Sequence, residues 1–205
     1  MRADKIIRRV MNIKRGDTLP YKGWNHDRTR RDLHTVFAEM GYTKGAEIGV
    51  ASGRHAVQML NAVPDLHLYL VDPYQGYHRY KQELCDKRFV AMKNRMKDRN
   101  VTIMHMTSLE ASQQIEDGSL DFVYIDGDHR FDAVMTDIIY WAPKVRQGGI
   151  VAGHDWYSFY QAGVMDAVYA YTRAHNINSW YITWEKEATA FWVQQQQPAD
   201  NYAEW

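Results

Sequence analysis

The chain has 205 residues, of which 45% are hydrophobic and 24% are charged, and this composition suits one globular domain with a full core. No apolar run approaches the roughly 20 residues of a membrane-spanning helix, and no signal-peptide core follows the basic start. Cys85 is the only cysteine, which excludes an internal disulfide and a cysteine-based metal site. We therefore expect a reducing, cytoplasmic setting.

The net charge is zero but unevenly spread. Residues 1–31 carry ten Lys or Arg against three Asp, and the compensating acids lie in the remainder. We interpret residues 1–31 as a basic N-terminal extension, solvated and partly helical, and residues 32–205 as the folded domain. Alternatively, the extension attracts an anionic ligand and covers a site with Tyr21 and Trp24.

Strands and helices alternate from about residue 44 onward. The apolar runs predict strands over 46–50, 67–71, 101–105, 120–125 and 150–153. The spacing predicts helices over 54–62, 80–98, 109–114, 131–142 and 161–174. Two final runs, 180–184 and 189–193, are rich in aromatic and β-branched residues and predict a hairpin. This order predicts an α/β fold with a parallel sheet, helices on both faces and an antiparallel hairpin at its end.

The turn after the first predicted strand contains Glu47, Gly49 and Gly53. Glycines let the backbone turn tightly and approach a ligand. Ala51 and Arg54 occupy two glycine positions of a G-x-G-x-x-G motif, which disfavours NAD. Asp72 ends the second predicted strand, where an acid can accept hydrogen bonds from ribose hydroxyls. A plain turn residue before Pro73 is the alternative.

The E-x-G-x-x-x-G pattern resembles the first motif of class I S-adenosylmethionine (SAM)-dependent methyltransferases. The resemblance implies a Rossmann-like three-layer sandwich with a mixed sheet of order 3-2-1-4-5-7-6. It also implies that Glu47 faces the amino group of the SAM methionine and that Asp72 holds the ribose. The remaining implied cofactor-binding residues are Gly49, Val50, Gly53, Thr107, Ser108 and Asp126. Thr107 and Ser108 would border the adenine, although Ser108 is also a good helix N-cap.

Asp126 and Asp155 follow the fourth and fifth predicted strands, which are neighbours in this order. The strand spacing puts them roughly 5 Å apart. Two carboxylates this close repel each other unless a proton or cation lies between them. A hard ion such as Mg²⁺ prefers oxygen ligands. His154 departs from such a set, because imidazole suits Fe, Ni or Zn better.

The run YIDGDHRFDAVMTDIIYWAPKVRQGGIVAGHDW resembles macrocin O-methyltransferase-like and cephalosporin-hydroxylase-like proteins and, more distantly, catechol O-methyltransferase. The resemblance implies a divalent metal, with Mg²⁺ preferred, bound by Asp126 and Asp155, and His154 stands at the remaining ligand position. His129 is the candidate general base, with a reference pKa near 6.5. Alternatively, His129 starts a helix and bonds to Asp126 or Asp128.

Two further groups accompany these candidates. We expect Asp137 to form a surface or half-buried salt bridge. Aromatic residues at the ligand end of the sheet could line an acceptor pocket, or simply pack: Tyr74, Tyr77, Trp156, Tyr157 and Tyr160.

The expected activity is metal-assisted O-methylation of a small-molecule hydroxyl, on a sugar, glycan or phenol. A metal-dependent oxygenase or hydrolase is one alternative, with His129 and His154 among the ligands. Nucleic-acid methylation is disfavoured, because strand four lacks a D-P-P-Y-type motif and the VDPY at 71–74 follows strand two. A SAM-binding protein without turnover is a third alternative, and a homodimer is left open.

Overall fold

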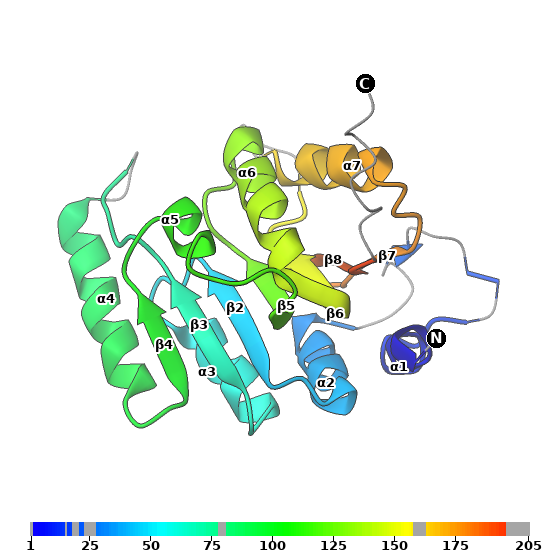
Figure 1. Ribbon diagram of the computed structural model, residues 1–205, viewed down its shortest axis with the longest axis horizontal. Helices are drawn as coiled ribbons and strands as arrows, with labels where there is room; N and C mark the ends of the chain where they lie inside the picture. Colours follow the sequence, from blue (N-terminus) through cyan, green and yellow to red (C-terminus); the bar gives the residue numbers. More distant parts are fainter. Residues whose placement is uncertain are drawn as a thin grey trace.

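The computed structural model describes residues 2–14, 16–17, 21–22, 28–77, 81–157 and 163–195 (Figure 1). The strands are β1 (Tyr21–Lys22), β2 (Lys44–Ile48), β3 (His67–Val71), β4 (Val101–Met104), β5 (Leu120–Ile125), β6 (Val145–Gly153), β7 (Trp180–Ile182) and β8 (Ala190–Val193). The helices are α1 (Arg2–Val10), α2 (Arg30–Met40), α3 (Arg54–Ala62), α4 (Gln82–Met96), α5 (Ser108–Ser112), α6 (Phe131–Trp141) and α7 (Val164–Ala174), with a 3₁₀ turn at Ala142–Lys144.

The described strands form one sheet in the order β1-β7-β8-β6-β5-β2-β3-β4. Strand β8 runs antiparallel to β6 and β7, and the other neighbouring strands pair in parallel. Without β1, this is the 3-2-1-4-5-7-6 order of a class I methyltransferase, so the predicted fold is confirmed. Strand β2, which is strand 1 in that numbering, lies between β3 and β5. From β2 the chain adds β3 and β4 on one side, and then crosses back to add β5 and β6 on the other side.

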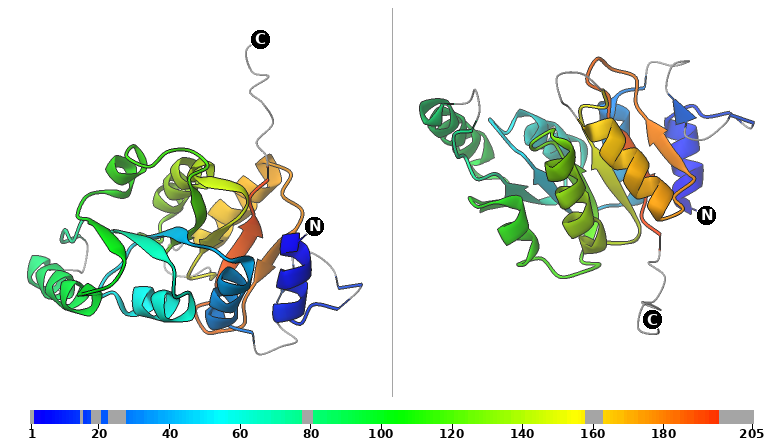
Figure 2. Two further views of the ribbon diagram at one scale, coloured as in Figure 1. Left: turned by 60° about the horizontal axis from the view of Figure 1, so that its bottom comes forward. Right: turned by 90° about the horizontal axis from the view of Figure 1, so that it is seen from above.

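Helices cover both faces of the sheet and give the molecule three layers (Figure 2). Helices α1 to α4 lie on one face, where Leu33, Met59 and Met92 belong to one buried cluster. Helices α5 to α7 lie on the other, where Trp141 and Val168 belong to a second cluster. The central strands β2 and β5 are buried on both sides, which explains the nearly continuous apolar sequence of β5.

The predicted boundaries match the structure most closely where the apolar pattern is interrupted by clear turn residues. Helix α3 and strands β3 and β5 have the predicted bounds. Strand β6 begins at Val145 rather than at residue 150, because the glycine pair bends the strand without ending it. Gly148 takes φ +79°, and the pairing register with β5 shifts between Leu120 and Phe122.

The N-terminal extension contributes to the core. Ile7 and Met11 are fully buried in the same cluster as the residues of α2. The expectation of a solvated extension is therefore wrong for these two residues. Strand β1 extends the sheet by pairing with β7. Trp24 and the side chain of Tyr21 lie outside the described residues, so their covering role stays a prediction, as does the boundary between 31 and 32.

Within the described ranges, no helix is both long and apolar enough to cross a membrane.

Candidate active site

The turn between β2 and α3 packs directly against the end of β5. Gly49 takes φ +87°, and a Cβ atom there would lie 2.2 Å from the carbonyl oxygen of Asp126. The amide of Asp126 in turn donates to the carbonyl of Ile48, with N and O 2.7 Å apart. Ala51 also adopts a left-handed conformation, with φ +48°. The turn between β2 and α3 and the loop that carries Asp126 therefore form one unit.

Asp72 shapes this turn from the end of β3. One carboxylate oxygen accepts hydrogen bonds from the amides of Val50 and Ala51, at 3.0 and 2.9 Å. The other oxygen accepts from the amide of Tyr74 at 2.8 Å. A carboxylate has about four lone-pair sites, so these bonds leave acceptor capacity for a ligand.

Glu47 is buried, with an exposed fraction of 1%, at the carboxyl end of β2. Its Oε1 lies 2.8 Å from Nδ1 of His55, whereas its Oε2 is buried without a hydrogen-bond partner in the described structure. Burial, followed by the negative charges of Asp126 and Asp72, raises the pKa of Glu47 well above its usual range. A buried acid with one unpartnered oxygen fits a cationic group of a ligand, such as the SAM ammonium.

Thr107 and Ser108 both serve the protein's own structure. Thr107, rather than Ser108, is the N-cap of α5: its hydroxyl accepts from the Glu110 amide, and the Glu110 carboxylate accepts from the Thr107 amide. The hydroxyl of Ser108 donates to Asp137 at 2.5 Å and accepts from Nε1 of Trp141 at 2.8 Å. The expectation that Ser108 caps the helix is therefore wrong.

Asp137 does not form the expected salt bridge with any described residue. Its side chain is buried on α6, where the hydroxyl of Ser108 in α5 donates a hydrogen bond to it. Burial raises the pKa of Asp137 to about 6, and the Ser108 bond opposes this rise. The salt-bridge prediction failed because α5 covers this side of α6 with a neutral donor.

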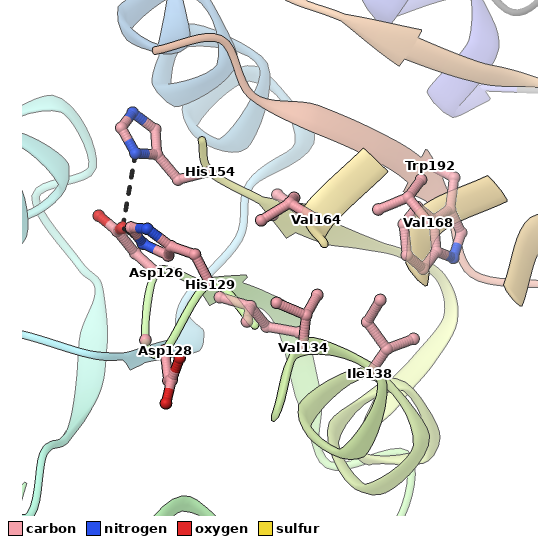
Figure 3. Close-up of a pocket in the computed structure, with 13 residues that line it drawn as sticks. Asp126, Asp128, His129, Val134, Ile138, His154, Val164, Val168 and Trp192 are labelled. Carbon is pink, nitrogen blue, oxygen red and sulfur yellow. Dashed lines mark ion pairs between the residues drawn. The ribbon is translucent and has the colours of Figure 1, made fainter. Parts of the chain in front are cut away.

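Asp126, His154 and Asp155 meet at the ends of β5 and β6. These strands pair in parallel with Ile125 opposite Gly153, and the ligating atoms of the three residues lie within 4.8 Å of one another. Asp155 adopts a left-handed conformation with φ +57°. The predicted proximity of the two acids is confirmed, and Figure 3 shows His154, Asp126 and His129 converging.

His129 lies against both acids. Its Nε2 is 2.8 Å from Asp155 Oδ2 and 3.7 Å from Asp126 Oδ1. Hydrogen bonds with Asp126 and then Asp155 raise the pKa of His129 to about 10. In this arrangement the imidazole is protonated at neutral pH and supplies the positive charge that the acid pair needs. It can therefore serve as a base only when these carboxylates bind something else.

His154 joins the acids to the N-terminal part of the chain. Its Nδ1 lies 3.4 Å from both Asp126 Oδ1 and Asp155 Oδ2, and its Nε2 lies 2.9 Å from Nη1 of Arg30. Burial lowers the pKa of His154, but hydrogen bonds with Asp126 and Asp155 outweigh it and raise this pKa to about 9. Because a guanidinium can only donate, the contact with Arg30 is a hydrogen bond only when Nε2 accepts and Nδ1 carries the ring proton. The two carboxylates therefore fit a divalent cation, whereas His154 could ligate one only after giving up this proton and the Arg30 contact.

Arg30 and Glu185 are site residues that the sequence pattern did not reveal. The backbone amide of Arg30 donates to the Glu185 carboxylate at 2.9 Å, which fixes the start of α2 to the loop between β7 and β8. Its side chain then reaches His154. The only signal in the sequence was the basic charge of residues 1–31, which does not identify one arginine among ten cations.

A pocket opens beside the acid cluster (Figure 3). Its interior, between α6, α7 and β8, has room for about one water molecule. Asp126, His129 and His154 line one part, and an apolar set lines the rest: Val134, Ile138, Val164, Val168 and Trp192.

The predicted aromatic residues lie elsewhere. Trp156 packs against Tyr169 and Trp180 at ring distances of 5.2 Å. Tyr74 packs against Phe89 at 4.8 Å. Tyr157 approaches the His129 ring at 6.5 Å, Tyr77 is exposed, and Tyr160 lies outside the described residues. An acceptor pocket made by these rings stays a prediction.

Comparisons with known proteins show a family match and a shared fold. Residues 46–156, more than half of the chain, match a family described as a methyltransferase domain. A curated relative, the uncharacterized protein y4gI of Sinorhizobium fredii, is 31% identical over 90 residues. That match covers 42% of this chain and only 10% of the relative.

Solved structures share the fold at low sequence identity. A Corynebacterium glutamicum protein has a TM-score of 0.58 at 14% identity, covering 96% of this chain and 89% of its own. The SAH-bound Podospora anserina methyltransferase PaMTH1 has a TM-score of 0.60 at 12% identity, with coverages of 82% and 78%. A spermidine synthase in complex with the transition-state analogue AdoDATO has a TM-score of 0.56 at 12% identity, with coverages of 83% and 60%. From its family match, this chain belongs to the methyltransferase-domain family, and its fold is that of the solved structures above.

Proposed function

We propose that this enzyme transfers the SAM methyl group to a hydroxyl oxygen of a small molecule, with a divalent cation held by Asp126 and Asp155. The observation that carries the proposal is the convergence of these two carboxylates at the ends of β5 and β6. They lie beside the cofactor turn, because Gly49 packs on the backbone of Asp126. A metal-bound hydroxyl and the methyl group would thus be held side by side, and such positioning lowers the barrier to transfer.

The cofactor residues in this proposal surround the turn after β2. Glu47 receives the ammonium at its unpartnered Oε2, and Asp72 receives the ribose hydroxyls. The backbone of Gly49, Val50 and Gly53 approaches the rest of the methionine and nucleoside. Thr107 and Ser108 border the adenine by their position before α5.

Asp126 and His129 have the catalytic roles. When bound, a cation such as Mg²⁺ lowers the pKa of a coordinated hydroxyl and orients it. The Nε2 atom of His129 lies 2.8 Å from Asp155 and 3.7 Å from Asp126. It takes the hydroxyl proton when these carboxylates bind the cation instead of the imidazole. His154 completes the metal set only if Arg30 releases it.

The acceptor we favour is a sugar or another polyol, with phenols next. This preference rests on the resemblance to macrocin O-methyltransferase-like proteins.

Calorimetry and methyl transfer test the proposal together. We expect wild-type protein to bind SAM, and methyl-labelled SAM to label a sugar or phenol acceptor only when Mg²⁺ is present. If Asp126 is a metal ligand rather than a SAM contact, Asp126→Ala should abolish transfer while SAH affinity stays within about threefold. Asp128→Asn, a change in the same loop at an acid paired with Arg130, is the matched control and should retain transfer. Unchanged transfer by Asp126→Ala would contradict the catalytic role, and activity without any divalent ion would contradict the metal.

A metal-dependent oxygenase is the second candidate, favoured by the two histidines beside the acids. Stoichiometric iron in purified protein would support it, and its absence together with methyl transfer would exclude it.

A further inference from the structure

Two histidines form a chain of contacts that begins at Oε1 of Glu47, whereas its other oxygen, Oε2, has no partner. Nδ1 of His55, in α3, is 2.8 Å from Oε1 of Glu47. Nε2 of His55 is 3.0 Å from Nε2 of His34, in α2. His34 is 2% exposed and the side chain of His55 10% exposed, so both rings are shielded from water. The residues come from three separate elements, and their contacts form a short buried chain.

Both imidazoles are neutral at physiological pH. Burial lowers the pKa of His34 to about 3, and the neighbouring His55, Arg30 and Arg31 act in the same direction. Burial also lowers the pKa of His55 to about 3, where Asp126 and Glu185 oppose the effect and Arg30 and His154 reinforce it. The contact between His55 and Glu47 is therefore a hydrogen bond rather than an ion pair.

A neutral imidazole has one donor and one acceptor nitrogen, so the chain of contacts has a direction. When Glu47 is ionised, Nδ1 of His55 must donate to it, and Nε2 of His55 must accept. Nε2 of His34 then carries the proton that this acceptor receives. His34 thus selects the His55 tautomer that points an N–H at the carboxylate.

We propose that His55, with its tautomer set by His34, is a positioning residue that presents the Glu47 carboxylate to the ammonium group of SAM. The inference rests on the proposed role of Glu47. A neutral donor orients Oε1 and adds no positive charge, so the carboxylate that forms when the ammonium binds keeps its charge available at Oε2. A charged partner would instead compete with the ammonium for that charge.

Two amide substitutions of His55 separate its two nitrogens. The amide of Asn occupies roughly the position of Nδ1, and that of Gln roughly the position of Nε2. We expect His55→Gln to weaken SAH binding by about tenfold or more, because a hydrogen bond to a charged group is lost. His55→Asn keeps the Glu47 contact and should stay within about threefold of wild type. Calorimetry should show that neither change affects binding of a deaminated SAH analogue.

Equal weakening of SAH and of the deaminated analogue by His55→Gln would overturn the proposal, because the effect would then be structural. So would a His55→Gln variant with wild-type affinity. In a Glu47→Gln background, adding His55→Gln should cause no further loss, since the ammonium contact is already gone. If wild type binds SAH no better than the deaminated analogue, the Glu47 assignment itself fails, and this inference fails with it.

Nitrogen-15 NMR of histidine-labelled wild-type protein provides a test that needs no variant. In the SAH complex we expect His55 to be protonated at Nδ1 and His34 at Nε2. The opposite tautomers, or a doubly protonated His55, would overturn the proposal even if every variant failed to fold.

Discussion

Three of the six non-glycine residues with positive φ in the described ranges lie around the proposed cofactor. Ala51, Tyr74 and Asp155 all take positive φ without being glycine, and each follows or lies within a loop at the carboxyl ends of the strands. Such conformations cost roughly 1–3 kcal/mol each and persist only where surrounding contacts impose them. Here the hydrogen bonds from the amides of Ala51 and Tyr74 to Asp72 provide those contacts. A single carboxylate therefore shapes two strained turns.

Gly49→Ala should damage both stability and cofactor binding. The new Cβ would collide with the Asp126 carbonyl, and alanine would also have to adopt φ +87°. Gly118→Ala is the matched control, because Gly118 takes φ +67° and a Cβ atom added there would meet nothing within 4 Å. We expect the control to lose about 1 kcal/mol from left-handed strain alone. Urea unfolding and SAH calorimetry should show a larger stability loss, and loss of binding, only for Gly49→Ala. Equal losses would refute the packing argument.

Asp137→Asn should stabilise the protein in a pH-dependent way. The folded-state pKa of Asp137, about 6, lies above the unfolded value, so the folded protein favours the protonated acid. The stability that this protonation gives is present below about pH 4 and is lost as pH rises through about 6. Asparagine keeps an acceptor for Ser108 without the charge. We expect a gain of about 2–3 kcal/mol at pH 8 and little gain at pH 4 in urea unfolding. An equal gain at both pH values would show that Asp137 titrates normally.

The individual residues differ in how far the sequence could identify them. Gly49, Asp72 and Asp126 follow strands that the apolar pattern marks clearly, so their place at one edge of the sheet was predictable. His34, His55 and Arg30 depend on how α2 packs against α3 and the final hairpin. Residues 34 and 55 are 21 positions apart, and no periodicity in the sequence connects them. Their contacts come from tertiary packing alone.

At the scale of elements, the strands were the most predictable part. The central strands are buried on both faces and are bounded by turn residues, whereas β1 is too short to show a period. Strand β1 has two residues and exists because β7 offers an edge to pair with. The helix α5 owes its start to a capping box between Thr107 and Glu110. That local signal is readable in sequence, but it competes with the cofactor role assigned to Thr107.

Thr107→Ala separates these two roles. Removing the cap should lower the free energy of unfolding by about 1 kcal/mol, and Thr107→Ser should restore most of it. Because the hydroxyl is used by α5, we expect SAH affinity to change little. Chemical unfolding and calorimetry measure the two quantities independently. A loss of SAH affinity at unchanged stability would instead place the Thr107 side chain against the adenine.

At the scale of the whole molecule, the N-terminal residues and the sheet form one packed structure. Helix α1 lies against α2, and β1 continues the sheet beyond β7 (Figure 1). Arg9 of α1 also pairs with Glu39 of α2. Since α2 carries both Arg30 and His34, disturbance of α1 has a direct physical route to the cofactor end of the sheet.

Ile7→Ala tests whether the N-terminal helix unfolds with the rest of the domain. Ile7 is fully buried, and its truncation should cost about 2–4 kcal/mol because apolar contacts are lost and a cavity is left. Lys5→Ala, an exposed position on the same helix, should change stability by less than about 0.5 kcal/mol. We expect circular dichroism and tryptophan fluorescence to report one shared urea transition, shifted to lower concentration by Ile7→Ala. If the main transition stays in place while a small separate one appears, α1 unfolds independently of the domain. Residues 1–31 would then be an extension that does not contribute to the stability of the domain.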